Sequence, residues 1–449
     1  MLKSNPKETA LDSSEPKTLV DKRIKWLFGV IVLIKVLVIF VFLPWIAQAV
    51  KHTYDFSNDP DFYAKIAINL SQGIGYRVFP DTTVTMFREP GYIIFLAGIF
   101  YLFGQNYFLT RIFNIVFSLI TAFFIYKIAG EMRMPRNAGI IAVLLFLLHP
   151  AFFIVESRLG VEGFFTMMLV ITVFCMLVAQ RKKDIFLFML CGICSAVTAL
   201  TRTTVIPFLI AWIMYIIVSR RLNMPVRIKA KAITVYVLTF FLIFSIWPLR
   251  NYLLSGKPII TATVSGDSLF QGMYVNKHRT PDISYYKILR NSTKEQLRYL
   301  QSAGLEPQYY GFHYLYATIK EEVRHSKLMK DIVTQEYKNN PLIFLKTVLL
   351  NSVFFWVRGG TITSTTLNSI LNVPILIMTA IGVFLQFRRG QNFFLILLLV
   401  FFIYSVHLPI LATARHHVPT VPFLLLFCGV FISWVLQKII KGFDNSSGR

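Results

Sequence analysis

The sequence predicts an all-α integral membrane protein, a multi-pass helical bundle of about 10 to 12 spans. Of its 449 residues, 55% are hydrophobic and only 15% are charged, which is more apolar surface than a soluble core can bury. Apolar stretches of helical length recur along the chain, separated by short polar segments. The net charge of +24 lies largely in these segments, as is typical of basic cytoplasmic loops, so no nucleic-acid partner is expected.

The first apolar stretch predicts a membrane anchor. Residues 1–23 are polar and are expected to form a cytoplasmic tail. Residues 24–47 are longer than the apolar core of a signal peptide and include Trp26 and Trp45 near their ends, so we interpret them as an uncleaved signal anchor. This orientation places residues 48–90 outside, as an external loop within an N-terminal transmembrane module of residues 24–254.

The external loop is predicted to carry a short amphipathic helix on the membrane surface. The pair Asp59-Pro60 is typical of a helix start, because Asp caps free amide groups and Pro is tolerated at the first helical position. Phe62, Ile66 and Leu70 then share one face. The two glycines that follow are expected to end the helix.

The distribution of charge decides which later apolar segments cross the membrane. Residues 91–103 are too short for a hydrocarbon core of roughly 30 Å and are expected to be re-entrant or interfacial. Residues 342–356 contain Lys346 and Asn351 and are expected to form an interfacial helix. Basic loops then fall inside if the spans are residues 107–131, 138–155, 163–180, 185–200, 205–218, 233–249, 370–387, 393–411 and 418–438. With the anchor, this gives about ten crossings with both termini inside, or about twelve if both short segments cross.

Residues 255–341 are the largest soluble segment and are expected to form a small external helical cap. The segment is rich in Tyr and mixed in charge. Helices are predicted over residues 293–301 and 314–338, separated by a break between Gly304 and Gly311. Residues 342–438 are expected to supply the interfacial helix and the last spans, and residues 439–449 a second cytoplasmic tail.

Ionisable residues gather at the predicted external ends of the spans, where burial makes such groups costly and therefore candidates for function. The principal acids are Asp59 and Glu162. Each has a structural alternative, because Asp59 can cap its helix and Glu162 can complement the positive end of the span that follows it. The other candidates are Arg88, Glu89, Arg202, Arg250, Arg415 and His416.

These residue types suit a displacement reaction at a phosphate-bearing lipid. Arg202 and Arg250 end spans outside, against the positive-inside trend, which favours ion pairing or anion binding. Arg415 and His416 can alternatively anchor the chain at lipid headgroups. A carboxylate can take the proton of an acceptor hydroxyl while fixed positive charge receives a departing phosphate. The sequence contains neither G-x-x-x-x-G-K-[ST] nor H-E-x-x-H, so an ATP-driven pump and a zincin-type protease are not expected.

An ordered set of motifs resembles the GT-C membrane glycosyltransferases, and within them glycosyltransferase family 39. That family includes protein O-mannosyltransferases and the lipid A aminoarabinose transferase. The resemblance covers roughly residues 50–440. Its motifs are Asp59-x-x-x-Tyr63 with Gly73-x-Gly75-Tyr76, Arg88-Glu89-Pro90-Gly91-Tyr92, Arg158 to Glu162, Leu200-Thr201-Arg202, Trp247-Pro248-x-Arg250-Asn251-Tyr252 and Arg415-His416-His417-x-Pro419.

The resemblance implies an inverting transferase that moves one sugar from a polyprenyl phosphate to a protein, lipid or glycan acceptor. Asp59 matches the loop acid expected to act as base or to position the acceptor, and Glu162 matches a second acidic position. The basic residues at 202, 250 and 415 match positions near the carrier phosphate, and the remaining candidates would bind substrate. The site would face outward from the plasma (inner) membrane.

Two questions stay open at this level. Some GT-C enzymes use a divalent metal, but the sequence offers no defensible ligand set, so we assign none. A lipid or polysaccharide transporter, or flippase, without glycosyl transfer is the alternative function, although such a protein would place its polar residues nearer the middle of the spans.

Overall fold

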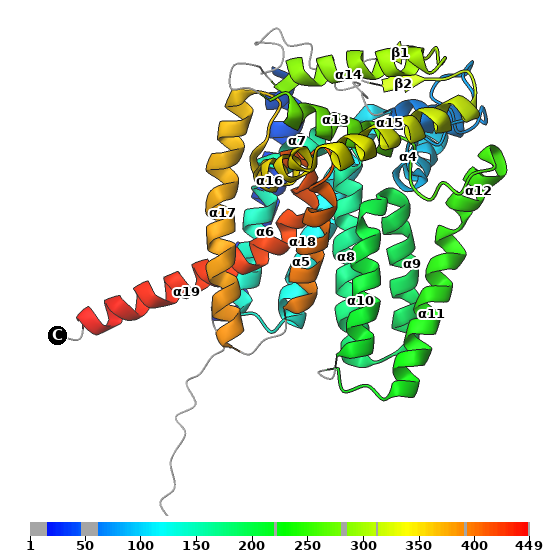
Figure 1. The fold of residues 1–449 in the computed structure, drawn as a ribbon. Helices are drawn as coiled ribbons and strands as arrows, with labels where there is room; N and C mark the ends of the chain where they lie inside the picture. Colours follow the sequence, from blue (N-terminus) through cyan, green and yellow to red (C-terminus); the bar gives the residue numbers. More distant parts are fainter. Residues whose placement is uncertain are drawn as a thin grey trace, which may run out of the picture. The chain divides into compact units, whose positions relative to one another are not determined.

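The computed structural model describes residues 16–45, 62–219, 222–279, 285–310, 313–389 and 393–447. These residues are almost entirely helical (Figure 1), with one two-stranded hairpin, so the predicted all-α class is confirmed. The chain divides into two compact units, Met1–Tyr54 and Asp55–Arg449. In the first unit, α1 (Pro16–Leu37) continues into the π-helical turn η1 (Val38–Phe42). Its segment Trp26–Trp45 is long and apolar enough to cross a membrane.

The second unit begins with two short helices that pack together, α3 (Tyr63–Ser71) and α4 (Pro90–Phe103). The predicted helix start at Asp59 is wrong, because Phe62 has a left-handed backbone with φ of 63° and the helix begins at Tyr63. Asp59 itself lies outside the described residues. The helix ends as predicted, since Gly73 has a φ of 75° that an α-helix cannot contain. Ile66 is fully buried, so α3 packs within the protein.

Eight further helical segments follow, before the predicted cap. They are α5 (Tyr107–Glu131), α6 (Arg136–Leu147), α7 (Pro150–Ser157), α8 (Glu162–Lys182), α9 (Ile185–Thr201), α10 (Ile206–Val218), α11 (Val226–Phe244) and α12 (Ile246–Ser255). A 3₁₀ turn, η2 (Thr203–Val205), joins α9 to α10. The chain bends by 50° between α6 and α7 and by 42° between α11 and α12. Pro150 and Pro248 lie beside these breaks, and a proline ring lacks the N–H that would continue the helix.

The cap contains three helices and the hairpin. They are α13 (Ser265–Lys277), α14 (Tyr285–Ser302), β1 (Gln308–Tyr310), β2 (His313–Leu315) and α15 (Ile319–Asn339). The predicted helix over residues 293–301 forms but is longer. The predicted helix over residues 314–338 starts too early, because Tyr314 pairs with Tyr309 in the hairpin and a capping box between Thr318 and Glu321 begins α15. A core that includes Phe270, Leu300, Met329 and Val333 joins the three cap helices.

The C-terminal part returns to apolar helices. They are α16 (Pro341–Val357), α17 (Ile362–Arg388), α18 (Phe394–His407), the 3₁₀ turns η3 (Ala414–His416) and η4 (Val418–Thr420), and α19 (Val421–Ser447). α16 leaves α15 at an angle of 108°, at the Asn340-Pro341 step. In Figure 1 the cap helices lie across one end of the bundle formed by the longer helices.

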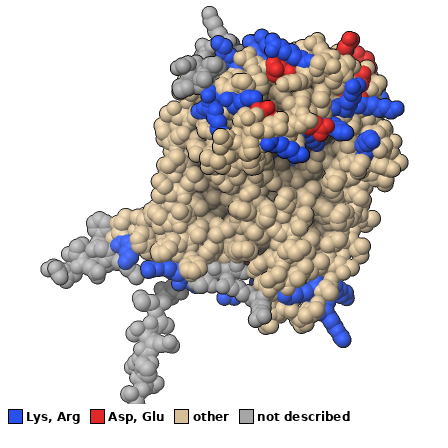
Figure 2. Space-filling model, in the orientation of Figure 1, with Lys and Arg blue, Asp and Glu red and all other residues tan. Residues whose placement is uncertain are grey.

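The chain is a multi-pass membrane protein. Five helices of the described residues are long and apolar enough to cross, or up to eight if each bent pair is one span, and four shorter apolar helices accompany them. Figure 2 shows a band of uncharged side chains between two charged ends. One end carries both acids and bases, whereas the charges visible at the other are Lys and Arg. The predicted number of crossings stays a prediction.

Candidate active site

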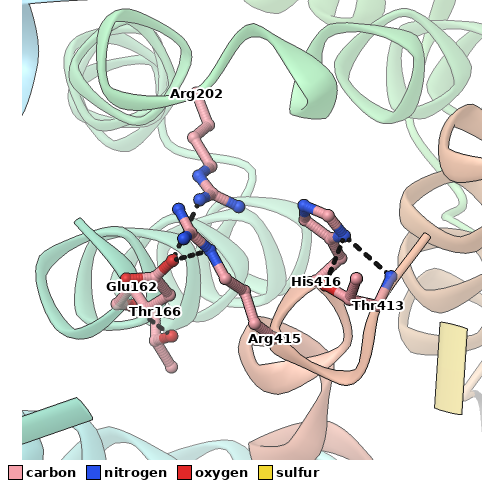
Figure 3. Close-up of polar contacts among 6 residues, drawn as sticks. All are labelled: Glu162, Thr166, Arg202, Thr413, Arg415 and His416. Carbon is pink, nitrogen blue, oxygen red and sulfur yellow. Dashed lines mark hydrogen bonds and ion pairs between the residues drawn. The ribbon is translucent and has the colours of Figure 1, made fainter. Parts of the chain in front are cut away.

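The site is organised around one carboxylate that holds two guanidinium groups (Figure 3). Glu162 Oε1 lies 3.1 Å from Arg202 Nη2 and 2.8 Å from Arg415 Nε. The side chains of Glu162 and Arg202 are 10% and 13% exposed, whereas that of Arg415 is 46% exposed. The structure therefore brings together three residues that are far apart in the sequence. The carboxylate thus gathers two guanidinium groups at one point, and one of them is half exposed to solvent.

Helix ends position these three side chains. Glu162 is the first residue of α8, where a carboxylate interacts favourably with the positive end of the helix dipole. Its own carbonyl accepts a hydrogen bond from Thr166 Oγ1 at 2.7 Å. A Cβ at Gly160 would lie 2.5 Å from Glu162 Oε2, so glycine leaves room for the carboxylate. Arg202 directly follows α9 in an extended conformation, which ends the helix and turns its side chain out of the helix ladder.

His416 fixes the turn that carries Arg415. The Thr413 backbone N–H donates to His416 Nδ1 at 3.1 Å, and Thr413 Oγ1 lies 3.3 Å from the same nitrogen. The imidazole also stacks on His407, with ring centroids 4.7 Å apart. Figure 3 shows His416 beside the Glu162–Arg202–Arg415 group. The predicted residues of the Arg415-His416 motif therefore do reach the group that contains Glu162.

The Arg88-Glu89 motif lies against the end of α9. Glu89 Oε1 accepts a hydrogen bond from Thr203 Oγ1 at 3.0 Å, one residue beyond Arg202. A Cβ at Gly91 would lie 2.8 Å from the Thr201 backbone nitrogen, so only glycine allows this close approach of α4 to α9. The Arg88 guanidinium is largely buried and lies 4.7 Å from the centre of the Phe87 ring. Glu89 is therefore next to Arg202, and Arg88 packs on the aromatic side of the same loop.

Arg250 belongs to a neighbouring cluster that fixes this loop. Its Nη1 donates to the Thr85 carbonyl at 3.1 Å, and its guanidinium lies 5.0 Å and 4.8 Å from the centres of the Tyr76 and Trp247 rings. The Tyr76 hydroxyl in turn donates to the Arg88 carbonyl at 2.9 Å. Arg250 thus supports the backbone just before Arg88. The structure shows no contact between Arg250 and Glu162.

The cap docks on the same loop through a buried acid, Glu322. Its carboxylate accepts hydrogen bonds from Thr85 Oγ1 at 2.8 Å and from the Met86 backbone N–H at 3.0 Å, and from the hydroxyl of Thr263. Burial raises the pKa of Glu322, and these hydrogen bonds and Arg250 oppose the rise only in part. The acid holds the cap helix α15 to the segment that precedes the Arg88-Glu89 motif.

Arg358 supports the Arg415 turn, although it is not among the residues predicted from the sequence. Its buried guanidinium donates to Asn276 Oδ1 at 2.8 Å and to the Ala412 carbonyl at 3.3 Å, and its own carbonyl accepts from the Ala414 N–H at 2.9 Å. Burial, with the charge of nearby Arg279, lowers its pKa to about 9. A signal was present, because Arg358 directly follows an apolar helix, as Arg202 does.

The roles of the predicted site residues stay predictions. Asp59, the expected base, lies outside the described residues. Within the described ranges, no three His, Cys, Asp or Glu side chains are grouped so that they could hold a metal ion, and the Glu162 carboxylate is bound to two guanidinium groups. The described residues therefore offer no ligand set for a divalent metal ion.

Residues 88–247 match the model of the dolichyl-phosphate-mannose-protein mannosyltransferase family. This match confirms the resemblance to GT-C glycosyltransferases that the ordered motifs indicate, over the part of the chain that contains Arg88, Glu89, Glu162 and Arg202. No curated protein matches the chain.

Two solved structures of ArnT from Cupriavidus metallidurans are similar to this chain, both at low sequence identity. The apo structure has a TM-score of 0.38 and 10% identity, and covers 93% of this chain and 75% of that one. The structure bound to undecaprenyl phosphate has a TM-score of 0.35 and 13% identity, and the match covers 91% of this chain and 78% of that one. Both TM-scores lie below 0.5, a level of likeness that does not by itself establish a shared fold.

Proposed function

We propose that this chain is an inverting glycosyltransferase that moves a single sugar from a polyprenyl-phosphate-linked donor to an acceptor on the external face of the membrane. The family match supports a glycosyltransferase of the GT-C type. The observation that carries the proposal is the group of Glu162, Arg202 and Arg415, which brings two guanidinium groups together at the ends of apolar helices and leaves one of them half exposed. Such a group is suited to the phosphate of a lipid carrier.

The proposed reaction is one displacement. The acceptor oxygen attacks the anomeric carbon while the bond from that carbon to the phosphate oxygen breaks, and the bonding electron pair stays with the phosphate. Arg202 and Arg415 stabilise the negative charge that develops there. The acceptor loses its proton to a carboxylate, and we keep Asp59 as the base proposed from its motif. Attack on the face opposite to the phosphate inverts the anomeric centre.

Glu162 is proposed to act as a positioning residue. One oxygen of its carboxylate already accepts from two guanidinium groups, which occupies the lone pairs that would otherwise receive a proton. The same contacts fix the direction in which both arginines present their remaining donors. Glu89, through Thr203, would hold the adjacent turn, and His416 would fix the turn of Arg415.

The orientation of the protein is part of the proposal. The Lys and Arg residues at the end opposite the cap support a cytoplasmic location for that end, since basic loops are retained inside. We propose a cytoplasmic location for both termini as well, from the distribution of basic residues in the sequence. The cap and the Glu162–Arg202–Arg415 group would then face the external or periplasmic side of the inner membrane, where the carrier phosphate of a translocated lipid lies.

Mass spectrometry of glycoproteins, envelope glycans and lipids from a deletion strain tests the proposal. We expect one sugar modification to disappear and to return with the wild-type gene but not with Arg415→Ala. An unchanged inventory would contradict the proposal. Purified protein in liposomes that moves a lipid or polysaccharide without forming a glycosidic bond would instead support a transporter.

A further inference from the structure

A row of basic residues runs along the outer face of cap helix α14. Lys287, Arg290, Lys294 and Arg298 are all exposed, and their spacing of three, four and four residues places them on one side of the helix. The residues buried on α14, which include Ile288, Leu289, Gln296 and Leu300, lie on the opposite side. We call these four basic residues the α14 stripe. The helix contains one acid, Glu295, which pairs with Arg298 at 3.0 Å.

The stripe faces away from the membrane-spanning bundle. Leu300 of α14 packs in one core with Phe270 of α13 and Met329 of α15. The other side of α13 meets the bundle, since the Leu411 N–H donates to the Ser268 carbonyl at 3.1 Å. α13 therefore lies between α14 and the bundle, and Figure 1 shows α14 as the outermost cap helix. Lipid headgroups are for this reason in the wrong place to neutralise the stripe.

The spacing of the basic residues along the stripe fits a polymer that carries a negative charge on each repeat unit. Successive basic residues are separated by about 4.5 to 6 Å along the helix axis, and the whole stripe is about 16 Å long. Figure 2 shows further Lys and Arg side chains over the cap end of the molecule.

We propose that the α14 stripe binds a linear acidic glycan, a chain of sugar or polyol units with one negative group per repeat. This inference rests on the proposed function and narrows it, because the glycan would be the acceptor whose end reaches the Glu162–Arg202–Arg415 group. Charge complementarity along the stripe holds the chain and speeds its capture. The stripe takes no part in the displacement itself.

Binding without donor tests the stripe directly. The full-length protein is placed in nanodiscs of neutral lipid, so that the bilayer does not compete, and titrated with fluorescent poly(glycerol phosphate), alginate and uncharged dextran. The double variant R290E/K294E is compared with K257E/K338E, which makes the same change of charge at exposed cap residues outside the stripe. All four positions are exposed, and melting temperatures confirm that both variants are folded.

We expect R290E/K294E to weaken binding of at least one acidic polymer by at least about tenfold, and K257E/K338E by less than about twofold. Binding by the wild-type protein should also weaken steeply between about 50 mM and about 500 mM salt. A preference for poly(glycerol phosphate) or for alginate would identify phosphate or carboxylate as the recognised group. If R290E/K294E does not fold, R290Q/K294Q takes its place, and we again expect weaker binding of the acidic polymer.

Three results would overturn the inference: unchanged affinity in the stripe variant, an equal loss in the control variant, or equal binding of uncharged dextran. The same experiments distinguish a failure of this inference from a failure of the proposed function. If polymer binding depends on the stripe but no sugar is transferred, the transferase proposal falls and the stripe stands. If transfer occurs and the stripe variant binds and reacts normally, only the stripe inference falls.

Discussion

Glu162→Gln removes the charge that holds the two arginines while keeping nearly the same size. The Arg202 pair is nearly buried, and a charge-assisted hydrogen bond in that setting contributes about 1.5–3 kcal/mol. Arg415 is 46% exposed, so solvent screening limits its pair with Glu162 to about 0.5–1 kcal/mol. Together these contacts supply about 2–4 kcal/mol toward fixing both guanidinium groups.

If all of this free energy serves positioning in the transition state, Glu162→Gln lowers kcat/KM by about 30-fold to about 1,000-fold. The assay is transfer of a labelled sugar from a polyprenyl phosphate to acceptor, with kcat and donor KM measured separately. Glu162→Asp is the matched control, because it keeps the charge and shortens the side chain by one methylene. We expect it to recover part of the lost rate.

The shape of the pH profile separates positioning from proton transfer. A positioning residue leaves the acidic limb of the kcat profile in place when it is replaced by Gln, because the base is elsewhere. Loss of that limb in Glu162→Gln would show that Glu162 itself takes the proton. A rate and a donor KM that both remain within about twofold of wild type would refute the positioning argument altogether.

Three further expectations follow from other contacts. Arg250→Ala should lower the free energy of unfolding by about 1–3 kcal/mol through loss of its hydrogen bond to the loop; an unchanged free energy of unfolding would contradict this supporting role. Burial raises the pKa of Glu322 above 4.5, so its contribution to stability is full below that pH and is lost as pH rises through the folded value. Melting curves of Glu322→Gln should lack this pH dependence, and a dependence that persists would assign it to another group. Cysteines placed at exposed Asn137 or Lys182 should resist an impermeant reagent added outside, whereas one at Lys257 should react; the reverse pattern would invert the orientation.

Hydrophobic periodicity predicted the existence of nearly every long helix, because burial in lipid imposes long apolar runs. It failed where short-range geometry decides. Phe62 has a left-handed backbone that separates Asp59 from the helix that Asp59 was expected to cap. Tyr314 was assigned to a helix but pairs in a hairpin, because its partner Tyr309 lies across a turn that propensity does not reveal. Helix α13 was not predicted at all, since its apolar residues serve the cap core and show little periodic contrast.

In the candidate site too, the chemistry of a residue predicts that it needs a partner, whereas packing decides which partner it has. In the proposed orientation, an arginine at the external end of an apolar helix needs an anion or a set of oxygens, because basic residues are otherwise retained on the cytoplasmic side. Arg202, Arg250 and Arg358 all meet this condition, yet they find different partners. Arg202 binds a carboxylate and faces the half-exposed Arg415. The guanidinium groups of Arg250 and Arg358 donate to backbone carbonyls and to asparagine side chains.

This difference in hydrogen-bond partners suggests different roles for Arg202 on the one hand and for Arg250 and Arg358 on the other. Backbone carbonyls carry only partial charge, so these hydrogen bonds do not neutralise Arg250 and Arg358, which fix the two segments that present Arg88 and Arg415. In the proposed reaction their charges raise the potential around the site, which strengthens the attraction for an anionic carrier over a longer distance. Replacing Arg250 or Arg358 by a neutral residue should therefore lower the rate at which the donor binds. It should also make this rate less dependent on salt concentration. A loss confined to kcat would show that the residue acts on the reacting phosphate itself.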